Sequence, residues 1–158
     1  MKILCDRTAL LEAVSVVSSV VPSKTTKPIL QNVLLRADSD GISLFATDLE
    51  MAAKIRLDSV KVSKEGTVLL PGKETAALLR ELSDPTVTLE SSDMRCRIES
   101  GGGSFVLLGE DPEQFPDETK LDAGKKLEIP SGVLHRICLL YTSPSPRDRS
   151  LSRMPSSA

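Results

Sequence analysis

The feature of this sequence that most constrains its fold is an order of predicted elements, strand–helix–three strands, that occurs twice along the chain. The elements of the first copy are a strand over residues 1–6, a helix over 7–21 and strands near 31–37, 42–47 and 51–60. Those of the second copy are a strand over residues 67–70, a helix over 72–82 and strands near 87–89, 94–99 and 105–108. Two such halves can join antiparallel sheets around two helices that pack together, so this order predicts an α+β domain.

Apolar residues at helical spacing predict the two helices. In the first helix, Asp6 or Thr8 is placed to cap the start, and Pro22 prevents its continuation. The residues that share its apolar face are Leu10, Val14, Val17 and Val21. The residues expected to face inward from the second helix are Ala76, Leu79 and Leu82.

Alternation of apolar and polar residues predicts the strands. Residues 38–41, Asp-Ser-Asp-Gly, form a turn signal between two alternating runs, which together predict a hairpin. The next run places Ala53, Ile55 and Leu57 on one face and charged side chains on the other, which is typical of a half-buried antiparallel strand. The second half repeats this alternation, and its expected inward residues are Val87, Leu89, Met94, Cys96 and Ile98.

Composition excludes several classes of protein. Apolar runs fall well short of the roughly 18 residues that a membrane span needs, so we expect no membrane partner. The net charge of −2 argues against a large basic surface for nucleic acid, but it allows light contact through a local patch. Cys5, Cys96 and Cys138 are far apart, which suits a reducing cytoplasm and predicts neither a disulfide framework nor a zinc site. Aromatic residues make up only 3% of the chain, so the core must be aliphatic.

The segment from Gly66 to Lys73 lies between a predicted strand and a predicted helix, where a phosphate-binding loop would lie. Five residues separate Gly66 from Gly72, one more than that loop allows, and the loop needs Ser or Thr after its lysine. Here Glu74 follows Lys73, and apolar strand residues fill the gap between the glycines. The segment therefore predicts a strand that leads into a helix, with no nucleotide site.

Candidate catalytic and metal-binding residues are few. Asp48 and Glu50 form a close carboxylate pair that could bind a cation or act in acid–base chemistry. A turn that hydrogen-bonds its own backbone is the stronger interpretation of that pair. His135 is the only histidine, and alone it predicts neither a catalytic triad nor a zinc site. We therefore expect no catalytic residue, no metal and no cofactor.

The C-terminal part changes composition twice. Residues 110–122 are rich in proline and acidic residues, which is typical of a linker. A strand is then expected over residues 127–130, followed by a helix over 131–139 that Ser131 would cap. From residue 140 to residue 158, Pro, Ser and Arg dominate, which predicts a disordered tail. That tail also resembles the translated adaptor sequence of a truncated reading frame, so it is expected to be non-native.

Four short motifs, in this order, resemble the first domain of the bacterial DNA polymerase III β subunits, the sliding clamps. The motifs are K-P-I-L-Q-N at residues 27–32, T-D-L-E-M at 47–51, L-P-G-K at 70–73 and Q-F-P at 114–116. The resemblance covers roughly residues 1–138 and rests on the order and spacing of the motifs together.

The resemblance implies a DNA-clamp-like fold whose helices face a central hole, and a function that is not enzymatic. In that family a closed homodimeric ring encircles duplex DNA in the cytoplasm and tethers the replicative polymerase. The implied partners are duplex DNA, held without sequence preference by its backbone, a second clamp protomer, DNA polymerase III and the clamp loader. Residues 1–121 would then form the whole first domain, and residues 122–139 a linker and the truncated start of a second domain.

The resemblance also implies roles for particular residues. Lys24 and Lys27, in the loop after the first helix, and Lys73, at the start of the second, would contact the DNA backbone. Without the resemblance, each would be interpreted as a solvated surface lysine. The strand edge that would join a second protomer comprises Phe105, Val106, Leu107 and Leu108. The alternative for that segment is an ordinary strand that faces the core.

Two other functions stay open at the level of sequence. One is a stand-alone α+β enzyme domain in which Lys73 and Asp48 act on a phosphorylated ligand. A deep pocket lined by both residues would favour that enzyme, whereas an open, helix-lined face would favour the clamp. The other is a single-domain regulatory protein that caps clamp subunits.

Overall fold

The computed structural model describes residues 1–116 and 128–142. Contacts within the chain divide it into two compact units, Met1–Leu121 and Asp122–Ala158, which are described separately. The elements of the first half are β1 (Lys2–Asp6), α1 (Arg7–Ser18), the 3₁₀ turn η1 (Pro28–Gln31), β2 (Asn32–Asp38), β3 (Gly41–Thr47), β4 (Ala52–Leu57) and β5 (Lys61–Lys64). Those that follow are β6 (Gly66–Pro71), α2 (Gly72–Glu81), β7 (Thr86–Ser92), β8 (Arg95–Ser100), β9 (Gly103–Leu108), the 3₁₀ turn η2 (Pro112–Gln114) and, in the second unit, α3 (Ser131–Thr142).

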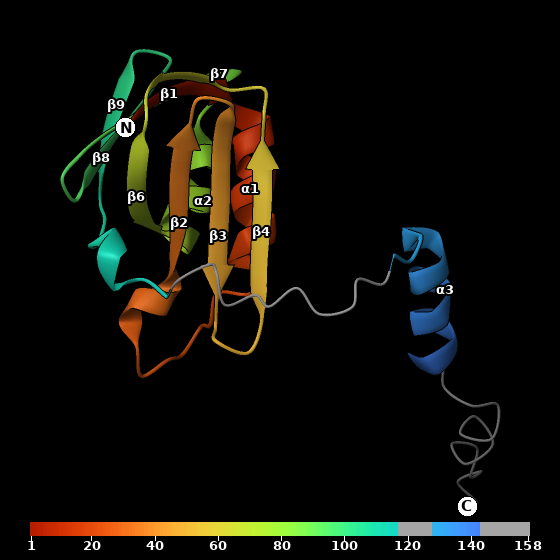
Figure 1. The fold of residues 1–158 in the computed structure, drawn as a ribbon. Helices are drawn as coiled ribbons and strands as arrows, with labels where there is room; N and C mark the ends of the chain where they lie inside the picture. The colour runs from red at the N-terminus through yellow and green to blue at the C-terminus, as the bar shows by residue number, and fades with distance from the viewer. Residues whose placement is uncertain (117–127, 143–158) are drawn as a thin grey trace, which may run out of the picture. The chain divides into compact units, whose positions relative to one another are not determined.

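Two antiparallel sheets and two helices make up the first unit. One sheet has the strand order β5-β1-β7-β8-β9, and the other has the order β4-β3-β2-β6. In Figure 1, β6, β2, β3 and β4 lie side by side in front of α1 and α2, so the helices cover one face of that sheet. The fold is α+β, with two packed helices against antiparallel sheets, and this part of the sequence-based prediction is confirmed.

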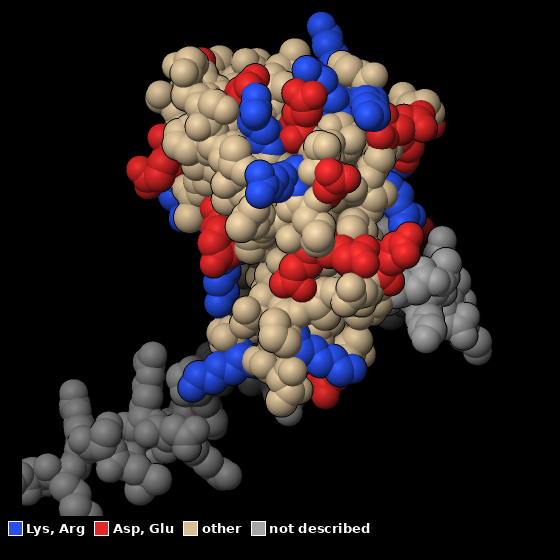
Figure 2. All heavy atoms as spheres, turned by 90° about the vertical axis from the view of Figure 1, so that its left-hand side faces the viewer, with Lys and Arg blue, Asp and Glu red and all other residues tan. Residues whose placement is uncertain are grey.

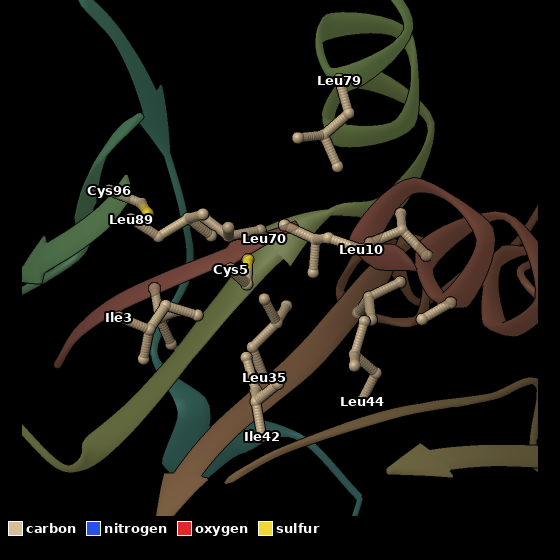
Figure 3. Close-up of a cluster of buried hydrophobic side chains, with 14 of the residues drawn as sticks. Ile3, Cys5, Leu10, Leu35, Ile42, Leu44, Leu70, Leu79, Leu89 and Cys96 are labelled. Atoms are coloured by element: carbon tan, nitrogen blue, oxygen red, sulfur yellow. The ribbon is translucent and has the colours of Figure 1, made fainter. Parts of the chain in front are cut away.

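The main core lies between the helices and the two sheets and is built from aliphatic side chains and two cysteines (Figure 3). Helices α1 and α2 direct Leu10 and Leu79 into it, and both side chains are fully buried. The other residues that Figure 3 labels come from the strands and are Ile3, Cys5, Leu35, Ile42, Leu44, Leu70, Leu89 and Cys96. Val87 and Ile98 are also fully buried, as their alternation predicts.

Helix α1 starts where the sequence predicts and ends earlier. The Asp6 carboxylate accepts a hydrogen bond from the Ala9 amide at 2.8 Å, so Asp6, rather than Thr8, is the cap. The predicted end at Val21 is wrong, because the helix proper stops at Ser18. Beyond it, the amides of residues 19–21 donate to carbonyls three residues back, which tightens the chain into a turn before Pro22. Val21 is nevertheless buried, as expected.

The strand expected over residues 51–60 is β4, which ends at Leu57, and a further strand that was not predicted, β5, follows at Lys61–Lys64. β4 pairs with β3, whereas β5 pairs with β1 in the other sheet. The chain therefore crosses between the two sheets after Leu57, and the first half contains four strands after its helix rather than three. A four-residue strand such as β5 is too short to show a clear period-two pattern.

Met94 was expected to face the core, and it is 55% exposed. It lies in the turn between β7 and β8, directly after Asp93, whose φ of +53° is the left-handed conformation that turns require. The alternation of the strand begins only at Arg95, so the direction of the Met94 side chain is set by the turn and not by the alternation of the strand. Cys96 and Ile98 are buried as predicted.

Residues 110–116 were interpreted as part of a linker, and that interpretation is wrong for this segment. The Glu110 amide donates to the Leu69 carbonyl at 3.2 Å, which extends the pairing along β6. Phe115 is only 7% exposed and meets Phe45 edge-to-face, with ring centroids 6.0 Å apart. Its cluster also contains Leu34 and Leu69. The segment therefore packs against the outer face of the sheet. The aliphatic main core is accompanied by a second, smaller hydrophobic cluster that contains two phenylalanines.

In the second unit, the strand expected over residues 127–130 is not formed at residues 128–130, the part of it that the structure describes. The helix is confirmed, but the Pro130 carbonyl accepts the first helical hydrogen bonds, so Ser131 is the first helical residue rather than the cap. Helix α3 continues to Thr142, so the expected disorder is wrong for residues 140–142. The remainder of that predicted tail, residues 143–158, lies outside the described residues.

Candidate functional site

A shallow hollow of about 340 Å³ lies between α1 and α2. Its lining residues are Ser15, Ser18 and Ser19 from α1 and its end, and Lys73, Ala76 and Arg80 from α2. Steps of three and four residues place the three α2 positions on one face of that helix. The hollow therefore has a basic wall on α2 and a neutral, hydroxyl-bearing wall on α1, and none of its lining residues in the described structure is acidic.

Helix α2 begins directly where β6 ends, which places Lys73 in its first turn. The residue at the cap position is Pro71, and no described side chain caps the free amide groups of that turn. The Thr75 hydroxyl instead donates to the Pro71 carbonyl at 2.7 Å. The uncapped amides, the positive end of the helix dipole and the Lys73 ammonium favour an anion at this point, while Glu74 adds a negative charge to the same turn.

The opposite end of α2 is held by α1. The Arg7 guanidinium donates to the Leu79 carbonyl and to the Asp84 carbonyl, each at 3.1 Å. A cation at a helix C-terminus stabilises the last carbonyl groups. Since Arg7 starts α1, the two helices run antiparallel, with the end of α1 beside the start of α2.

Gly72 allows this close approach of α1 to the start of α2. A Cβ atom at position 72 would lie 2.9 Å from Ser18 Oγ and 2.9 Å from Val33 Cγ2, which is shorter than a real side chain tolerates. The Ser18 hydroxyl itself is buried and has no hydrogen-bond partner among the described residues. The Ser18 hydroxyl is therefore enclosed beside the start of α2 with its hydrogen-bonding capacity unused among the described residues.

Lys24 and Lys27 lie in the loop that follows α1, and both are exposed. The Thr25 hydroxyl accepts a hydrogen bond from the Lys27 amide at 3.0 Å, which shapes this loop locally. Neither lysine lines the hollow. The loop departs from the end of α1 that lies beside the start of α2, so the structure places the loop lysines and Lys73 at the same end of the helix pair.

Asp48 forms a turn with its own backbone, as the sequence predicts. Its carboxylate accepts hydrogen bonds from the Met51 amide at 2.6 Å and from the Glu50 amide at 2.9 Å, and these bonds lower the pKa of Asp48. Asp48 does not line the hollow of Lys73. The pocket that a phosphate-acting enzyme would need, with both residues in its wall, is therefore not formed by the described residues.

Strand β9 is the edge of its sheet, and the four residues expected at a subunit interface all lie on it. Phe105 and Leu107 are paired with Ile98 and Cys96 of β8, so they point to the core side, where Leu107 packs partly against the core. Val106 and Leu108 point to the outer face and are 55% and 67% exposed. Phe105 is 41% exposed, so one face of β9 turns toward the core while three of its apolar side chains remain exposed, and the subunit-interface role stays a prediction.

The outer face beside β9 carries charge of both signs. Figure 2, which views the side where β8 and β9 lie in Figure 1, shows basic and acidic side chains interspersed with uncharged surface. A second hollow, of about 460 Å³, lies here. Its lining residues are Glu90, Ser92, Asp93, Arg95, Arg97 and Val106.

The remaining candidate groups have no chemistry that the structure supports. Burial raises the pKa of the Cys5 thiol to about 12 and that of Cys96 to about 11, so both remain protonated and unreactive at neutral pH. His135 lies on the exposed surface of α3, as expected. Within residues 1–116 and 128–142, no group of three His, Cys, Asp or Glu side chains could hold a metal ion.

Sequence reasoning missed Arg80 and Ser18 as members of the site. A signal for Arg80 was present, because its spacing of seven residues from Lys73 is two helical turns. The involvement of Ser18 depends on how closely the helices approach, which the sequence of α1 alone does not encode.

Comparisons with known proteins show the family that this chain resembles in sequence and fold. The family described as "DNA polymerase III beta subunit, N-terminal domain" matches residues 1–121. The chain is 31% identical to the beta sliding clamp of Synechococcus elongatus over 137 residues, which cover 85% of this chain and 36% of that protein. It is 29% identical to the beta sliding clamp of Haemophilus influenzae, covering 87% of this chain and 38% of that protein. The chain thus spans little more than a third of the length of these relatives.

Solved structures show the same relation. The DNA polymerase sliding clamp of Bacillus subtilis superposes with a TM-score of 0.81 and 25% identity, over 87% of this chain and 38% of that one. The pol III beta of Caulobacter crescentus gives a TM-score of 0.78 and 31% identity, over 86% and 37%. Among the described residues, every helix is too short or too polar to cross a membrane.

Proposed function

Because the chain belongs to the DNA polymerase III β subunit family, whose N-terminal domain it matches over residues 1–121, we propose that it is a fragment of a sliding clamp and that its α1–α2 face lies against duplex DNA. The single observation that carries this proposal is the basic hollow between the helices, with Lys73 and Arg80 on one wall and no acidic lining residue among those described. Lys24 and Lys27 extend the basic character at one end.

The contact we propose is light and without sequence preference. Lysines on helix termini and loops donate to phosphate oxygens, which are the same along every duplex. A ring that slides needs few such contacts, since each phosphate neutralised adds to affinity and to salt dependence. The chain's net charge of −2 is consistent with a surface that carries only a few basic residues for DNA contact.

The whole protein is proposed to be a non-enzymatic processivity factor of the cytoplasm. Its homodimeric ring would encircle duplex DNA and hold the replicative polymerase, with the clamp loader as a further partner. The present chain would supply the first domain of each protomer, and β9 would be the edge that meets the second protomer. In support, β9 has hydrogen-bonded ladder partners along its length only in β8, among the described strands, and it exposes three of its apolar side chains.

Duplex binding at low salt tests the proposal. The wild-type chain should bind two unrelated duplexes equally and weakly, and the affinity should fall steeply between 50 and 200 mM salt. Replacing both Lys24 and Lys73 by alanine should lower the slope of log affinity against log salt by about 2, since each lost phosphate contact removes about 0.9. Binding that survives high salt, or that prefers one sequence, would contradict the proposal.

A further inference from the structure

Another hollow, of about 430 Å³, lies on the outer face of the sheet β4-β3-β2-β6, the face that α1 and α2 do not cover. Its lining residues are Leu34 and Arg36 of β2, Thr67 of β6, and Asp111, Pro112 and Glu113 at the start of η2. The hollow therefore lies between the sheet and the segment of residues 110–116 that packs on it. Its volume is within the range of about 300–1,000 Å³ that is usual for ligand sites.

Two opposite charges line this hollow without a described partner. Arg36 is exposed on the sheet side and Glu113 on the η2 side, and neither forms an ion pair with another residue that the structure describes. The Asp111 carboxylate is already engaged, since it accepts hydrogen bonds from the Glu113 amide at 3.0 Å and from Gln114 Nε2 at 3.2 Å. The charges available to a ligand are therefore one guanidinium and one carboxylate.

Apolar surface lies between these charges. Leu34 is buried in the small cluster that includes Phe115, and Pro112 is half-buried. Long charged side chains place their methylene stems along such apolar surface while their charged ends reach a partner. The hollow therefore suits a ligand that presents an acid and a base on flexible stems.

The backbone of β6 adds hydrogen-bonding groups beside the hollow. β6 is an edge of its sheet, and the Leu69 carbonyl points to the open side, where it accepts a hydrogen bond from the Glu110 amide. Successive residues of a strand direct their backbone groups to alternate sides, so the amide and carbonyl of Thr67 point the same way as those of Leu69. Beyond Glu110 the chain leaves this edge for η2, and within the described ranges no strand pairs with Thr67 on that side. An extended segment can add to the open part of the edge.

We propose that this hollow binds an extended peptide segment of a partner protein, with one acidic and one basic residue two positions apart. Side chains two positions apart lie on the same face of an extended segment, so the acid meets Arg36 and the base meets Glu113. The Thr67 backbone groups bond the main chain of the peptide, and the hollow selects its side chains. The inference does not rest on the proposed DNA contact, because the hollow and the helices lie on opposite faces of the sheet.

The test titrates the full chain with blocked tripeptides and follows its amide signals by NMR. Two probes carry both charges in opposite order, acetyl-Asp-Val-Lys-amide and acetyl-Lys-Val-Asp-amide. Two carry one sign, acetyl-Asp-Val-Asp-amide and acetyl-Lys-Val-Lys-amide. Free valine presents an ammonium and a carboxylate without a peptide chain. At least one mixed-charge peptide should shift the signals of residues 34–36, 66–69 and 110–114, whereas the single-sign peptides and valine should not.

Charge-removing variants then locate the site. Arg36→Gln and Glu113→Gln should each raise the Kd of the mixed-charge peptide about 2- to 5-fold, the effect of losing one exposed ion pair. Lys61→Gln and Glu12→Gln are matched controls that remove exposed charges from β5 and α1, and they should leave the Kd unchanged. The amide spectrum of each variant shows whether its fold is intact.

Three outcomes would overturn the inference. In the first, none of the peptides shifts the signals of the hollow. In the second, a single-sign peptide or valine shifts them as much as the mixed-charge peptides do. In the third, Arg36→Gln and Glu113→Gln bind the mixed-charge peptide as tightly as their two controls.

Discussion

The α1–α2 face and the β9 edge differ in where their backbone hydrogen bonds go. On the helix face the backbone groups are used within α1 and α2, apart from the uncapped first turn of α2, and the side chains that line the hollow are cationic, hydroxyl-bearing or small. On β9 one row of amide and carbonyl groups points away from β8, beside the exposed side chains of Val106 and Leu108. Flexible cations make contacts that exchange readily with water and salt, whereas an apolar edge strand forms a continuous ladder with another strand.

The difference shows how one small domain can combine a surface that moves along DNA with a surface that holds another protein subunit. A surface that moves along DNA must bind weakly and at many equivalent positions, which phosphate contacts provide. A surface that closes a ring must bind for long times, which strand pairing and apolar burial provide. Both depend on the same core, because Leu79 supports the helix face, and Cys96 and Ile98 anchor β8, the strand that pairs with β9.

The largest expected effect comes from removing core support beneath the helix face. Leu79→Ala should lower the free energy of unfolding by about 2–5 kcal/mol, because Leu79 is fully buried and its loss leaves a cavity. Thermal or denaturant unfolding measures this. The adjacent Leu78→Ala is the matched control, since the same atoms are removed from a half-buried site, and its loss should be clearly smaller. Equal losses would show that α2 is not packed in the orientation described.

An intermediate effect is expected where the two helices meet. Gly72→Ala introduces a Cβ atom 2.9 Å from Ser18 Oγ and Val33 Cγ2, so it should destabilise the domain by about 1–3 kcal/mol through overpacking. It should also widen the hollow and weaken duplex binding without removing a charge. Gly132→Ala, where nothing lies within 4 Å of the added Cβ, is the control. Unchanged stability in Gly72→Ala would mean that α1 is further from α2 than the structure shows.

At the β9 edge the effect on stability should be the smallest and the effect on association the largest. Val106→Lys places a charge on an exposed edge residue, so the free energy of unfolding should change by less than about 0.5 kcal/mol. Self-association of the chain at high concentration should fall, because an edge charge opposes strand pairing. Light scattering measures the change, and Thr88→Lys, on the outer face of the interior strand β7, is the control. A wild-type chain that is strictly monomeric at high concentration would show that the edge is already covered.

Much of this fold could be predicted from sequence because local patterns determine it. Alternation at Cys96 and Ile98 and helical spacing at Leu10, Val14 and Val17 reflect burial directly. The errors occur where tertiary contacts override local pattern. β5 belongs to a different sheet from β4, which depends on pairing with β1, and Phe115 docks on Phe45 from a segment whose composition is typical of a linker.

The candidate site was predictable in part for the same reason. Lys73 was singled out through the resemblance of the L-P-G-K motif at residues 70–73, since the local pattern alone marks only the start of a helix after a strand. Arg80 shares a face of α2 with Lys73, whereas Ser18 joins them only through the packing of α1 against α2, which Gly72 permits. Residues that share one face of a single helix can be identified from their spacing in the sequence. A contact between residues of two different helices cannot.

The most direct test of the central claim, that the helix face meets DNA and the β9 edge meets protein, is one NMR experiment on the isotopically labelled chain. Duplex DNA should shift the amide signals of residues 15–19, 24–27 and 72–80 and leave those of 103–108 in place. Raising the protein concentration without DNA should shift the signals of residues 103–108 and leave those of residues 15–19, 24–27 and 72–80 in place. The account is contradicted if DNA shifts the β9 signals first, or if it shifts neither set at low salt.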